Sequence, residues 1–210
     1  MIEPAFTRGR QGQPKRLFRT QKDLIRQTLE TIQKVNKMKF DNSIVQTTFH
    51  SPLGEMIIAA TDKGLAGVWF AGQRHLPPQL VKPYVWREDP EHPVLRQTIA
   101  QLTEYYAGTR TTFDLPLDLG HGTAFQQSVW QALLAIPQGG TLSYGQVSQR
   151  IGKPEAVRAV GAAVGRNPVS VIVPCHRVLG SDGSLTGYAG GLHRKTALLK
   201  LEGALQESML

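Results

Sequence analysis

The sequence predicts an α+β fold, with a small antiparallel sheet in the first half of the chain and short helices in the second. Within residues 43–70, three runs of β-branched, aromatic and other apolar residues are separated by tight turns. From residue 123 onwards, apolar residues recur at helical spacing between well-marked helix boundaries. Strands followed by helices along the chain are typical of the α+β class.

Length and composition narrow the class of protein. The 210 residues suit one larger domain or two small ones, and an apolar fraction of 40% suffices for a core. No run approaches the ~18 apolar residues of a membrane span, and no signal peptide is recognisable. We therefore expect a cytoplasmic protein with no membrane partner, and its single cysteine suits a reducing compartment.

The net charge of +8 is unevenly distributed. Residues 1–37 hold nine Lys and Arg against three Asp and Glu, which gives +6. Residues 38–124 hold seven against nine (−2), and residues 125–210 hold eight against four (+4). The two ends of the chain are therefore suited to face a polyanion, although most Lys and Arg side chains in proteins are simply solvated.

Residues 1–37 begin with a stretch rich in Gly, Pro, Gln and Arg, which predicts a flexible tail. Apolar residues at helical spacing predict a short helix within 21–35 (Leu24, Ile25, Leu29, Ile32). A basic arm that adds non-specific DNA affinity is one interpretation of this tail. An accessory extension, a start codon upstream of Met38 and a transit peptide stay open as alternatives.

Residues 38–120 are expected to form an N-terminal α/β domain. Its strands are predicted at 44–49, 56–60 and 65–70, with turns at 51–54 and 62–64. A proline-rich, charged segment at 71–92 predicts a loop. A helix is predicted over 94–106, which Gly108 ends, and 113–117 predicts a further short strand. The histidines of this domain have no metal-binding spacing and no cysteine partner.

Residues 121–210 are expected to form a second domain, which opens with two helices, over 123–137 and 143–152. Thr123 with Gln126, and Ser143 with Gln146, each form a capping box, in which two residues satisfy each other's free backbone N–H groups. A third helix is predicted over 154–165, so the second and third helices with their glycine-containing turn are a helix-turn-helix candidate.

The third helix, 154–165, consists almost entirely of Ala, Gly and Val. Glycine destabilises a helix interior by about 0.5–1 kcal/mol relative to alanine, so Gly161 needs another reason. One reason is close packing against a neighbouring helix. The other is that a slim helix fits the narrow minor groove of DNA.

The segment after this helix contains the candidate reactive residues, Cys175 and His176. Four of the five residues 169–173 are apolar, which predicts a short buried strand. Pro174 has no backbone N–H and would end it, which delivers Cys175 and His176 to a turn at the edge of the core. Downstream, 179–185 predicts a turn, 186–192 a glycine-rich loop without a P-loop signature, and 195–201 an amphipathic helix that Gly203 ends.

Cys175 is the only cysteine in the chain. A lone cysteine is more often a small buried hydrophobe than a nucleophile. An intrachain disulfide and a paired-cysteine redox site are excluded, and a thiolate-rich zinc site is disfavoured. His176 places a base beside the thiol, but the residues alone leave both interpretations open.

Pro174 to Val178, preceded by Asn167-Pro168, resembles the active-site signature of the O6-alkylguanine-DNA alkyltransferases. The resemblance extends over about 80 residues, beginning with the helix at Phe125. It implies a ribonuclease H-like N-terminal domain and a winged-helix-like, helix-turn-helix catalytic domain. Some family members hold zinc in the N-terminal domain, but that domain has no cysteine here, and we expect no metal.

The resemblance implies that Cys175 is the nucleophile. His176 takes the thiol proton through a water, and Glu202 orients His176. Tyr144 helps to force the base out of the helix and donates a hydrogen bond to the leaving guanine. A thiol with a pKa near 8.5 needs such a base at neutral pH.

Further residues are implied in binding DNA and the base: Arg158, Asn167, Val178, Tyr188 and Ala189. Arg158 matches the arginine that fills the stack left by the rotated nucleotide. Asn167 ties the helix-turn-helix to the active-site turn, and the carbonyls of Cys175 and Val178 accept from the exocyclic amine of guanine. Tyr188 and Ala189 lie in the loop that matches the guanine pocket. Some members carry Ser where this chain has Ala189, so a backbone N–H is expected to contact the guanine oxygen.

The implied function is DNA repair by irreversible transfer of the O6-alkyl group of a flipped guanine in double-stranded DNA, bound through the minor groove, to Cys175. We expect one turnover per molecule, no cofactor, a monomer, and O4-methylthymine as a second substrate. A non-catalytic protein of the same fold that binds alkylated bases is the main alternative, and Cys175 argues against it. A thiol hydrolase and a helix-turn-helix regulator are further alternatives. No motif supports a hydrolase, and the third helix lacks the polar side chains that a regulator needs to read bases.

Overall fold

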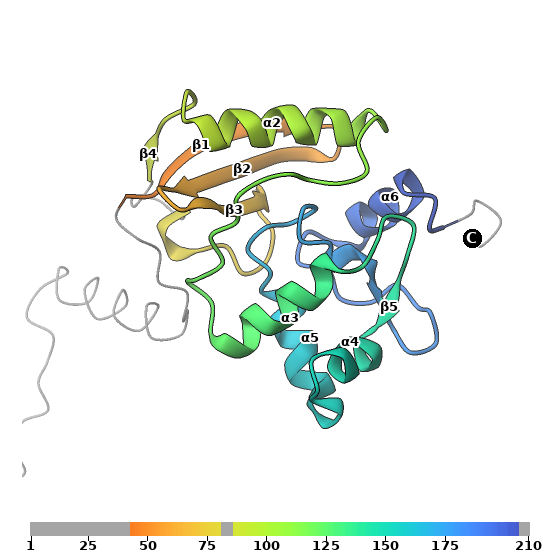
Figure 1. Cartoon of the computed structure of the whole chain (residues 1–210). Helices are drawn as coiled ribbons and strands as arrows, with labels where there is room; N and C mark the ends of the chain where they lie inside the picture. Colours follow the sequence, from red (N-terminus) through yellow and green to blue (C-terminus); the bar gives the residue numbers. More distant parts are fainter. Residues whose placement is uncertain (1–42, 81–85, 206–210) are drawn as a thin grey trace, which may run out of the picture. The chain divides into compact units, whose positions relative to one another are not determined.

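A four-stranded sheet covered on one face by a long helix forms the N-terminal half of the molecule, and shorter helices form most of the rest (Figure 1). The computed structural model describes residues 43–80 and 86–205, which belong to one compact unit that spans 36–210. The predicted tail at 1–37, its helix, and part of the loop at 71–92 lie outside the described residues.

The sheet follows the predicted meander. Its strands β1 (Val45–Ser51), β2 (Gly54–Thr61) and β3 (Gly64–Phe70) pair antiparallel in sequence order. Gly54 and Gly64 begin their strands with φ angles of 112° and 143°, which other residues rarely adopt. In the predicted loop, a short 3-10 helix η1 (Pro78–Leu80) is followed by β4 (Arg87–Glu88), which pairs in parallel with β1. Two exposed charged residues carry no strand pattern, so β4 was not predictable.

Helix α2 (Pro93–Tyr106) covers one face of the sheet and confirms the predicted helix (Figure 1). It buries Leu95, Leu102 and Tyr105, and the chain leaves the helix at Gly108, with φ 74°. The predicted strand at 113–117 is wrong, because only Leu117 forms an isolated bridge, to Leu65 of β3.

Two features prevent a strand at 113–117. Pro116 has no N–H to donate to a ladder, and its carbonyl accepts from Leu65. The side chain of Gln101 occupies both the N–H and the carbonyl of Asp114. The segment therefore crosses the edge of β3 without extending the sheet.

The helices of the second half follow the predicted boundaries closely: α3 (Ala124–Leu134), α4 (Tyr144–Arg150), α5 (Val157–Gly165) and α6 (Leu192–Leu201). Both predicted capping boxes are present. The first turn of the third predicted helix is a separate 3-10 helix, η2 (Pro154–Ala156), and α6 begins three residues earlier than predicted. Helices α3, α4 and α5 pack against one another, and α4, η2 and α5 form the helix-turn-helix.

The predicted strand at 169–173 is wrong, although the whole segment is buried. Only Val169 bridges the edge of the sheet, at Val68 of β3, and the chain then turns back on itself. Val171 has a φ of 72°, which is unfavourable for a β-branched residue and incompatible with a strand. The turn leads into the 3-10 helix η3 (Cys175–Arg177) and the short strand β6 (Val178–Leu179), which pairs in parallel with β5 (Leu142–Ser143).

One apolar cluster runs from the sheet through to the helices. It includes Met56 and Val68 from the strands, Trp130 from α3, Val173 beside the active-site turn and Leu198 from α6. The two halves therefore share a core, and the position of the active-site turn depends on both. Among the described residues, no helix is long and apolar enough to cross a membrane, and no group of His, Cys, Asp and Glu side chains could hold a metal ion.

Candidate active site

Glu202, directly after α6, is the centre of a buried hydrogen-bond network. Its Oε1 accepts from His176 Nε2 at 2.9 Å, from Arg177 Nη2 at 2.8 Å and from the Tyr105 hydroxyl at 2.7 Å. Its Oε2 accepts from Arg177 Nε at 2.8 Å. Burial by itself raises the pKa of this carboxyl, but the hydrogen bonds from His176 and Arg177 lower it to about 2. Glu202 is therefore ionised at neutral pH.

His176 is fully buried and is held by Glu202 through one ring nitrogen only. Because Nε2 faces a carboxylate, we assign the proton of the neutral ring to Nε2, which makes Nδ1 the acceptor. In the described part of the chain, no hydrogen-bond partner reaches the buried Nδ1. Burial lowers the pKa of His176, against the opposing effect of Glu202. The result is a neutral imidazole with a free lone pair, which a general base requires.

Cys175 precedes His176 in the same 3-10 turn and retains 5% of its surface exposed. Asn167 Nδ2 donates to its sulfur at 3.1 Å. Burial raises the pKa of the Cys175 thiol, and the Asn167 hydrogen bond and the Lys195 ammonium offset this only in part. The sulfur is therefore protonated at neutral pH and needs a base before it can act as a nucleophile.

Asn167, just after α5, joins the helix-turn-helix to the turn that carries the cysteine. In addition to Cys175, its Nδ2 donates to the carbonyl of Val173 at 2.7 Å, and its Oδ1 accepts from the N–H of Val169 at 3.0 Å. These bonds span the turn that contains the unfavourable backbone of Val171. One buried amide thus satisfies backbone groups on both sides of this turn.

Asn167→Ala is expected to destabilise the protein by about 2–3 kcal/mol, because it leaves buried backbone groups without partners. In a chain of this size that lowers Tm by roughly 4–12 °C. Thermal unfolding followed by circular dichroism measures the change. Arg166→Ala, which removes an exposed side chain at the preceding position, should shift Tm by less than about 2 °C; equal shifts for the two variants would contradict this role of Asn167.

Tyr144, at the start of α4, points its hydroxyl toward the glycine-rich loop. The hydroxyl lies 3.3 Å from the carbonyl of Thr186 and 3.2 Å from that of Gly187. Tyr188 in this loop is buried, and Ala189 is half-buried with its carbonyl accepting from the N–H of Arg74. The structure thus brings Tyr144 to the predicted pocket loop.

Lys195 is a residue of the site that sequence reasoning misses, because its segment has the pattern of an ordinary amphipathic helix. The side chain is fully buried, and Nζ donates to the carbonyls of Val178 at 2.5 Å and Thr186 at 2.6 Å. Burial lowers the pKa of Lys195 to about 8, although the nearby Cys175 opposes the shift. Lys195 therefore ties the strand after the cysteine to the pocket loop.

Tyr105 and Arg177 were also missed as members of the site. Arg177 lies within the recognised signature and is buried, with Nη1 donating to the carbonyl of Ile136. Tyr105 comes from a different half of the molecule and had the pattern of a core aromatic. Local sequence gives no signal for either contact with Glu202, which lies 97 residues from Tyr105.

Arg158 does not belong to the buried network; it is exposed on α5, as are the small residues Ala159 and Ala162. A Cβ added to Gly161 would lie 3.8 Å from the ring of Tyr144, an ordinary contact. Close packing therefore does not require glycine at position 161. Helix α5 presents a slim face with one arginine to solvent.

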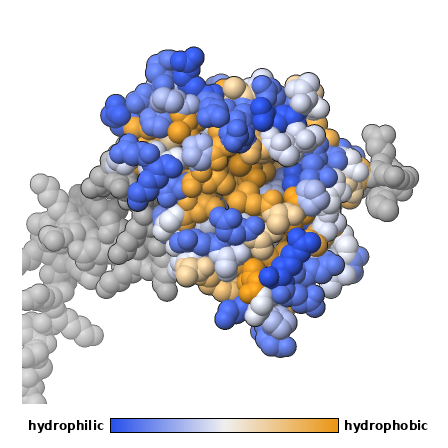
Figure 2. Space-filling model, viewed as in Figure 1, coloured by the Kyte–Doolittle hydropathy of each residue, from blue (hydrophilic) through white to orange (hydrophobic). Residues whose placement is uncertain are grey.

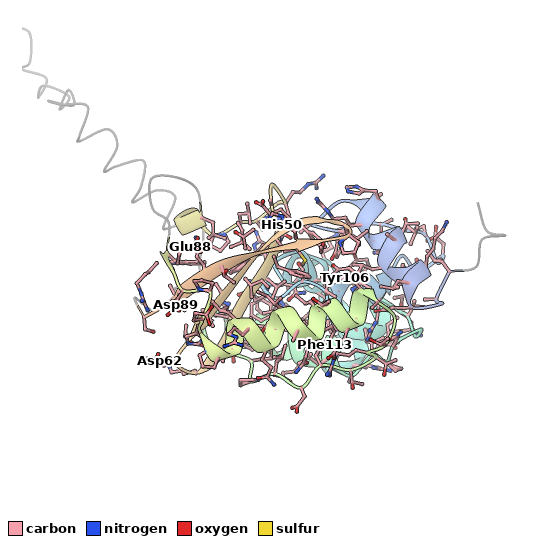
Figure 3. All side chains as sticks on the ribbon, turned by 90° about the horizontal axis from the view of Figure 1, so that it is seen from above. His50, Asp62, Glu88, Asp89, Tyr106 and Phe113 are labelled. Carbon is pink, nitrogen blue, oxygen red and sulfur yellow. The ribbon has the colours of Figure 1, made fainter. Side chains whose placement is uncertain are left out.

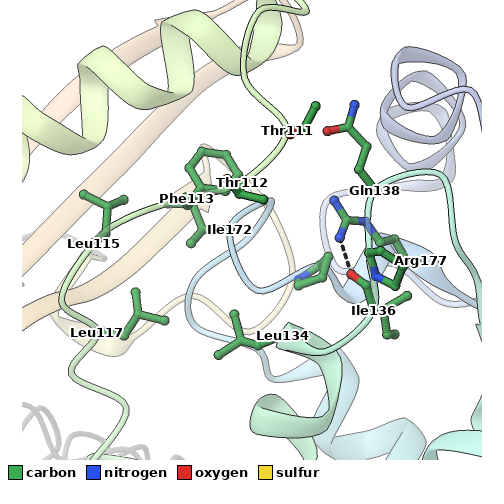
Figure 4. A pocket seen from close by; sticks show the side chains of 12 residues that line it. Thr111, Thr112, Phe113, Leu115, Leu117, Leu134, Ile136, Gln138, Ile172 and Arg177 are labelled. Atoms are coloured by element: carbon green, nitrogen blue, oxygen red, sulfur yellow. Dashed lines mark hydrogen bonds between the residues drawn. The ribbon is translucent and has the colours of Figure 1, made fainter.

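A pocket of about 650 Å³ opens on the face shown in Figure 2, where apolar residues surround a hollow. Segments 111–117, 134–138 and 172–177 line it (Figure 4). Its lining includes Pro174 and Arg177 but neither Cys175 nor His176. The pocket thus adjoins the back of the turn that carries Cys175, and the Cys175 sulfur does not line it.

Comparison with protein-family models assigns both halves of the described structure. Residues 44–119 match the ribonuclease-like domain of the 6-O-methylguanine DNA methyltransferases, and residues 124–204 match their DNA-binding domain. These two matches confirm the predicted fold class, a ribonuclease-like sheet domain followed by a helical domain.

Relatives that match about three quarters of the chain agree with these family models. The methylated-DNA–protein-cysteine methyltransferase of Mycobacterium tuberculosis is 47% identical over 155 residues, which cover 74% of this chain and 90% of the relative. That of Methanosarcina acetivorans is 46% identical over 156 residues, or 74% and 96% of the two chains. The crystal structure of Mycobacterium tuberculosis OGT in complex with DNA superposes with a TM-score of 0.68 at 45% identity, covering 76% of this chain and 93% of that one. The chain therefore belongs to the methylated-DNA–protein-cysteine methyltransferases, the O6-methylguanine-DNA methyltransferases of DNA repair.

Proposed function

We propose that Cys175 is the residue that accepts the alkyl group, and that one molecule accepts one group. The observation that carries the proposal is the arrangement of His176 beside the only cysteine of the chain: Glu202 fixes its Nε2, and no residue within 43–80 or 86–205 bonds to its Nδ1. A soft thiolate is the side-chain nucleophile best suited to attack a saturated carbon. His176 generates this thiolate by taking the proton of the Cys175 thiol.

In this mechanism His176 Nδ1 takes the proton of the Cys175 thiol through a water. The sulfur then attacks the alkyl carbon, the S–C bond forms and the C–O6 bond of guanine breaks. Tyr144, whose hydroxyl makes long bonds to two loop carbonyls, turns to donate a hydrogen bond to the leaving guanine. The proton that His176 took from the thiol returns through water to the guanine anion, so a proton replaces the alkyl group on the base. The carbonyls of Cys175 and Val178 accept from the guanine amine, and the loop with Tyr188 and Ala189 encloses the base. No step regenerates the thiol.

The partner is double-stranded DNA, entered through the minor groove. The slim exposed face of α5 and the +4 charge of residues 125–210 support this. Arg158 fills the space left by the flipped nucleotide, and flipping costs a few kcal/mol, which the basic contacts offset. Asn167 holds this helix against the active-site turn. A solved relative, Mycobacterium tuberculosis OGT, was crystallised in complex with DNA.

The other expectations from the family resemblance form part of the same proposal. Residues 121–210 bind DNA and carry out the transfer, and residues 38–120 support them. The protein acts in the cytoplasm as a monomer without a cofactor, and it also accepts O4-methylthymine.

The test is mass spectrometry after reaction with a duplex that contains O6-methylguanine. We expect one methyl group per molecule, located on the peptide that contains Cys175, and a burst of repair that stops at one equivalent. Methanol in the supernatant, or more than one repaired base per protein molecule, would contradict the proposal.

A further inference from the structure

We propose that Tyr105, on helix α2 of the sheet domain, is a positioning residue for methyl transfer: its hydroxyl shares Glu202 Oε1 with His176 and thereby sets the orientation and basicity of that histidine. This inference rests on the proposed function of His176 as the base. It assigns the sheet domain a part in the chemistry beyond support of the helical domain.

The first support is the geometry of the hydroxyl. Tyr105 Oη lies 2.7 Å from Glu202 Oε1, the same oxygen that is 2.9 Å from His176 Nε2. Tyr105 is 1% exposed, and the side chain of Glu202 is fully buried. A hydrogen bond from a hydroxyl to an ionised, buried carboxylate is among the stronger ones in proteins.

The second support is that the ring of Tyr105 is held in place. Its centroid lies 5.4 Å from that of Tyr106, edge to face, and 5.4 Å from that of Phe113. The end of α2 that carries Tyr106 lies beside α6, which leads to Glu202 (Figure 3). The hydroxyl is therefore directed at the carboxylate by the packing of a different domain.

The charge of Glu202 is divided among its donors. Oε1 accepts from Tyr105, His176 and Arg177, so each donor reduces the negative charge that the others experience. Among the described residues, the other charged or titratable groups that act on this network are Lys195, near His176, and Tyr106, near Tyr105, and the Cys175 sulfur lies near the backbone of His176. Removal of the Tyr105 hydroxyl leaves all of these groups in place. Glu202 Oε1 then has one donor fewer, so His176 experiences more of its negative charge. The imidazolium form is then stabilised, and the pKa of His176 rises.

The decisive comparison is Tyr105→Phe with Tyr106→Phe. Both remove one hydroxyl from adjacent residues of α2, but the hydroxyl of Tyr106 contacts the sulfur of Met56, not Glu202. Methyl transfer is measured from pH 5 to 8.5. For Tyr105→Phe we expect the acidic limb of the pH–rate profile to shift to higher pH by about half a unit. At a given pH on that limb this is roughly a three-fold loss of rate. Tyr106→Phe should keep the wild-type profile.

Two results would overturn the inference. One is an unchanged profile for Tyr105→Phe, and the other is an equal loss of rate at every pH, which is what a purely structural role would give. If the wild type itself transfers no methyl group, the proposed function fails instead.

Nuclear magnetic resonance of histidine labelled with ¹⁵N, without DNA, separates the two proposals. It should show a proton on His176 Nε2 in the wild type and a raised pKa in Tyr105→Phe; equal pKa values would sink the inference whatever the activity. If Tyr105→Phe does not fold, a measurement on the wild-type protein tests the inference instead. The Tyr105 hydroxyl proton and the proton on Nε2 approach the same oxygen, so a nuclear Overhauser contact between them is required.

Discussion

Cys175→Ala is expected to abolish methyl transfer and to leave the binding of methylated DNA nearly unchanged. The chain has no second thiol, and the hydroxyl and amine side chains around the site are harder nucleophiles with higher barriers at an alkyl carbon. We expect the rate to fall by more than about 10⁴-fold, which is more than 5 kcal/mol of barrier. Transfer from a radiolabelled duplex measures the rate, and fluorescence anisotropy measures binding.

Cys175→Ser is the matched control. It keeps an acceptor for the Asn167 amide, which in the wild type lies 3.1 Å from the sulfur, and so preserves the local network better than alanine. Because serine gives up its proton far less readily than cysteine, this variant should also be inactive while it retains the wild-type Tm. Methyl transfer by either variant, with the label on another residue, would show that Cys175 is not the acceptor.

The elements that were predictable have local causes. The capping boxes at Thr123 and Ser143 each close within four residues, and the turns at Gly54 and Gly64 depend on the backbone freedom of one residue. Such signals are complete in the sequence. The strands β1 to β3 were equally predictable, because consecutive strands of a meander pair with each other.

The segment 169–173 shows why the rest was not predictable. A run of buried valines fits a strand, but burial and periodicity do not distinguish a strand from any other buried path. Val171 adopts a left-handed backbone because Asn167 and the edge of β3 fix the chain on both sides of it. Those constraints come from tertiary contacts, which override local preference.

The site divides in the same way. Cys175 and His176 are adjacent in sequence, so a base beside the thiol could be proposed from the residues. Glu202 could be identified as a site residue only through the family resemblance. Tyr105 and Lys195 could not be identified from the sequence at all. A buried lysine and a core tyrosine look ordinary in sequence, and their contacts form only when α2, α6 and the active-site turn come together.

Glu202→Gln is expected to cost about 3–5 kcal/mol of stability at pH 7, the range measured when one partner of a buried ion pair is removed. Arg177 is 6% exposed and donates twice to this carboxylate, so its charge would stay buried without a counter-ion. Chemical unfolding at pH 7 measures the loss. Glu104→Gln is the control, because Glu104 pairs with Arg110 at the surface, where a salt bridge contributes at most about 1 kcal/mol.

The Glu202 carboxylate also makes the free energy of unfolding depend on pH in the acidic range. The pKa of Glu202 is about 2 in the folded protein against a reference of 4.5, so the folded state holds fewer protons than the unfolded state between these values. The contribution, about 3 kcal/mol at 1.36 kcal/mol per pH unit, is complete above pH 4.5 and is lost as the pH falls towards 2. Glu202→Gln has no such group, so the difference in stability between it and the wild type should shrink steadily from pH 4.5 to pH 2.5. A difference that stays constant over this range would mean that the ionised carboxylate does not hold the active-site turn together.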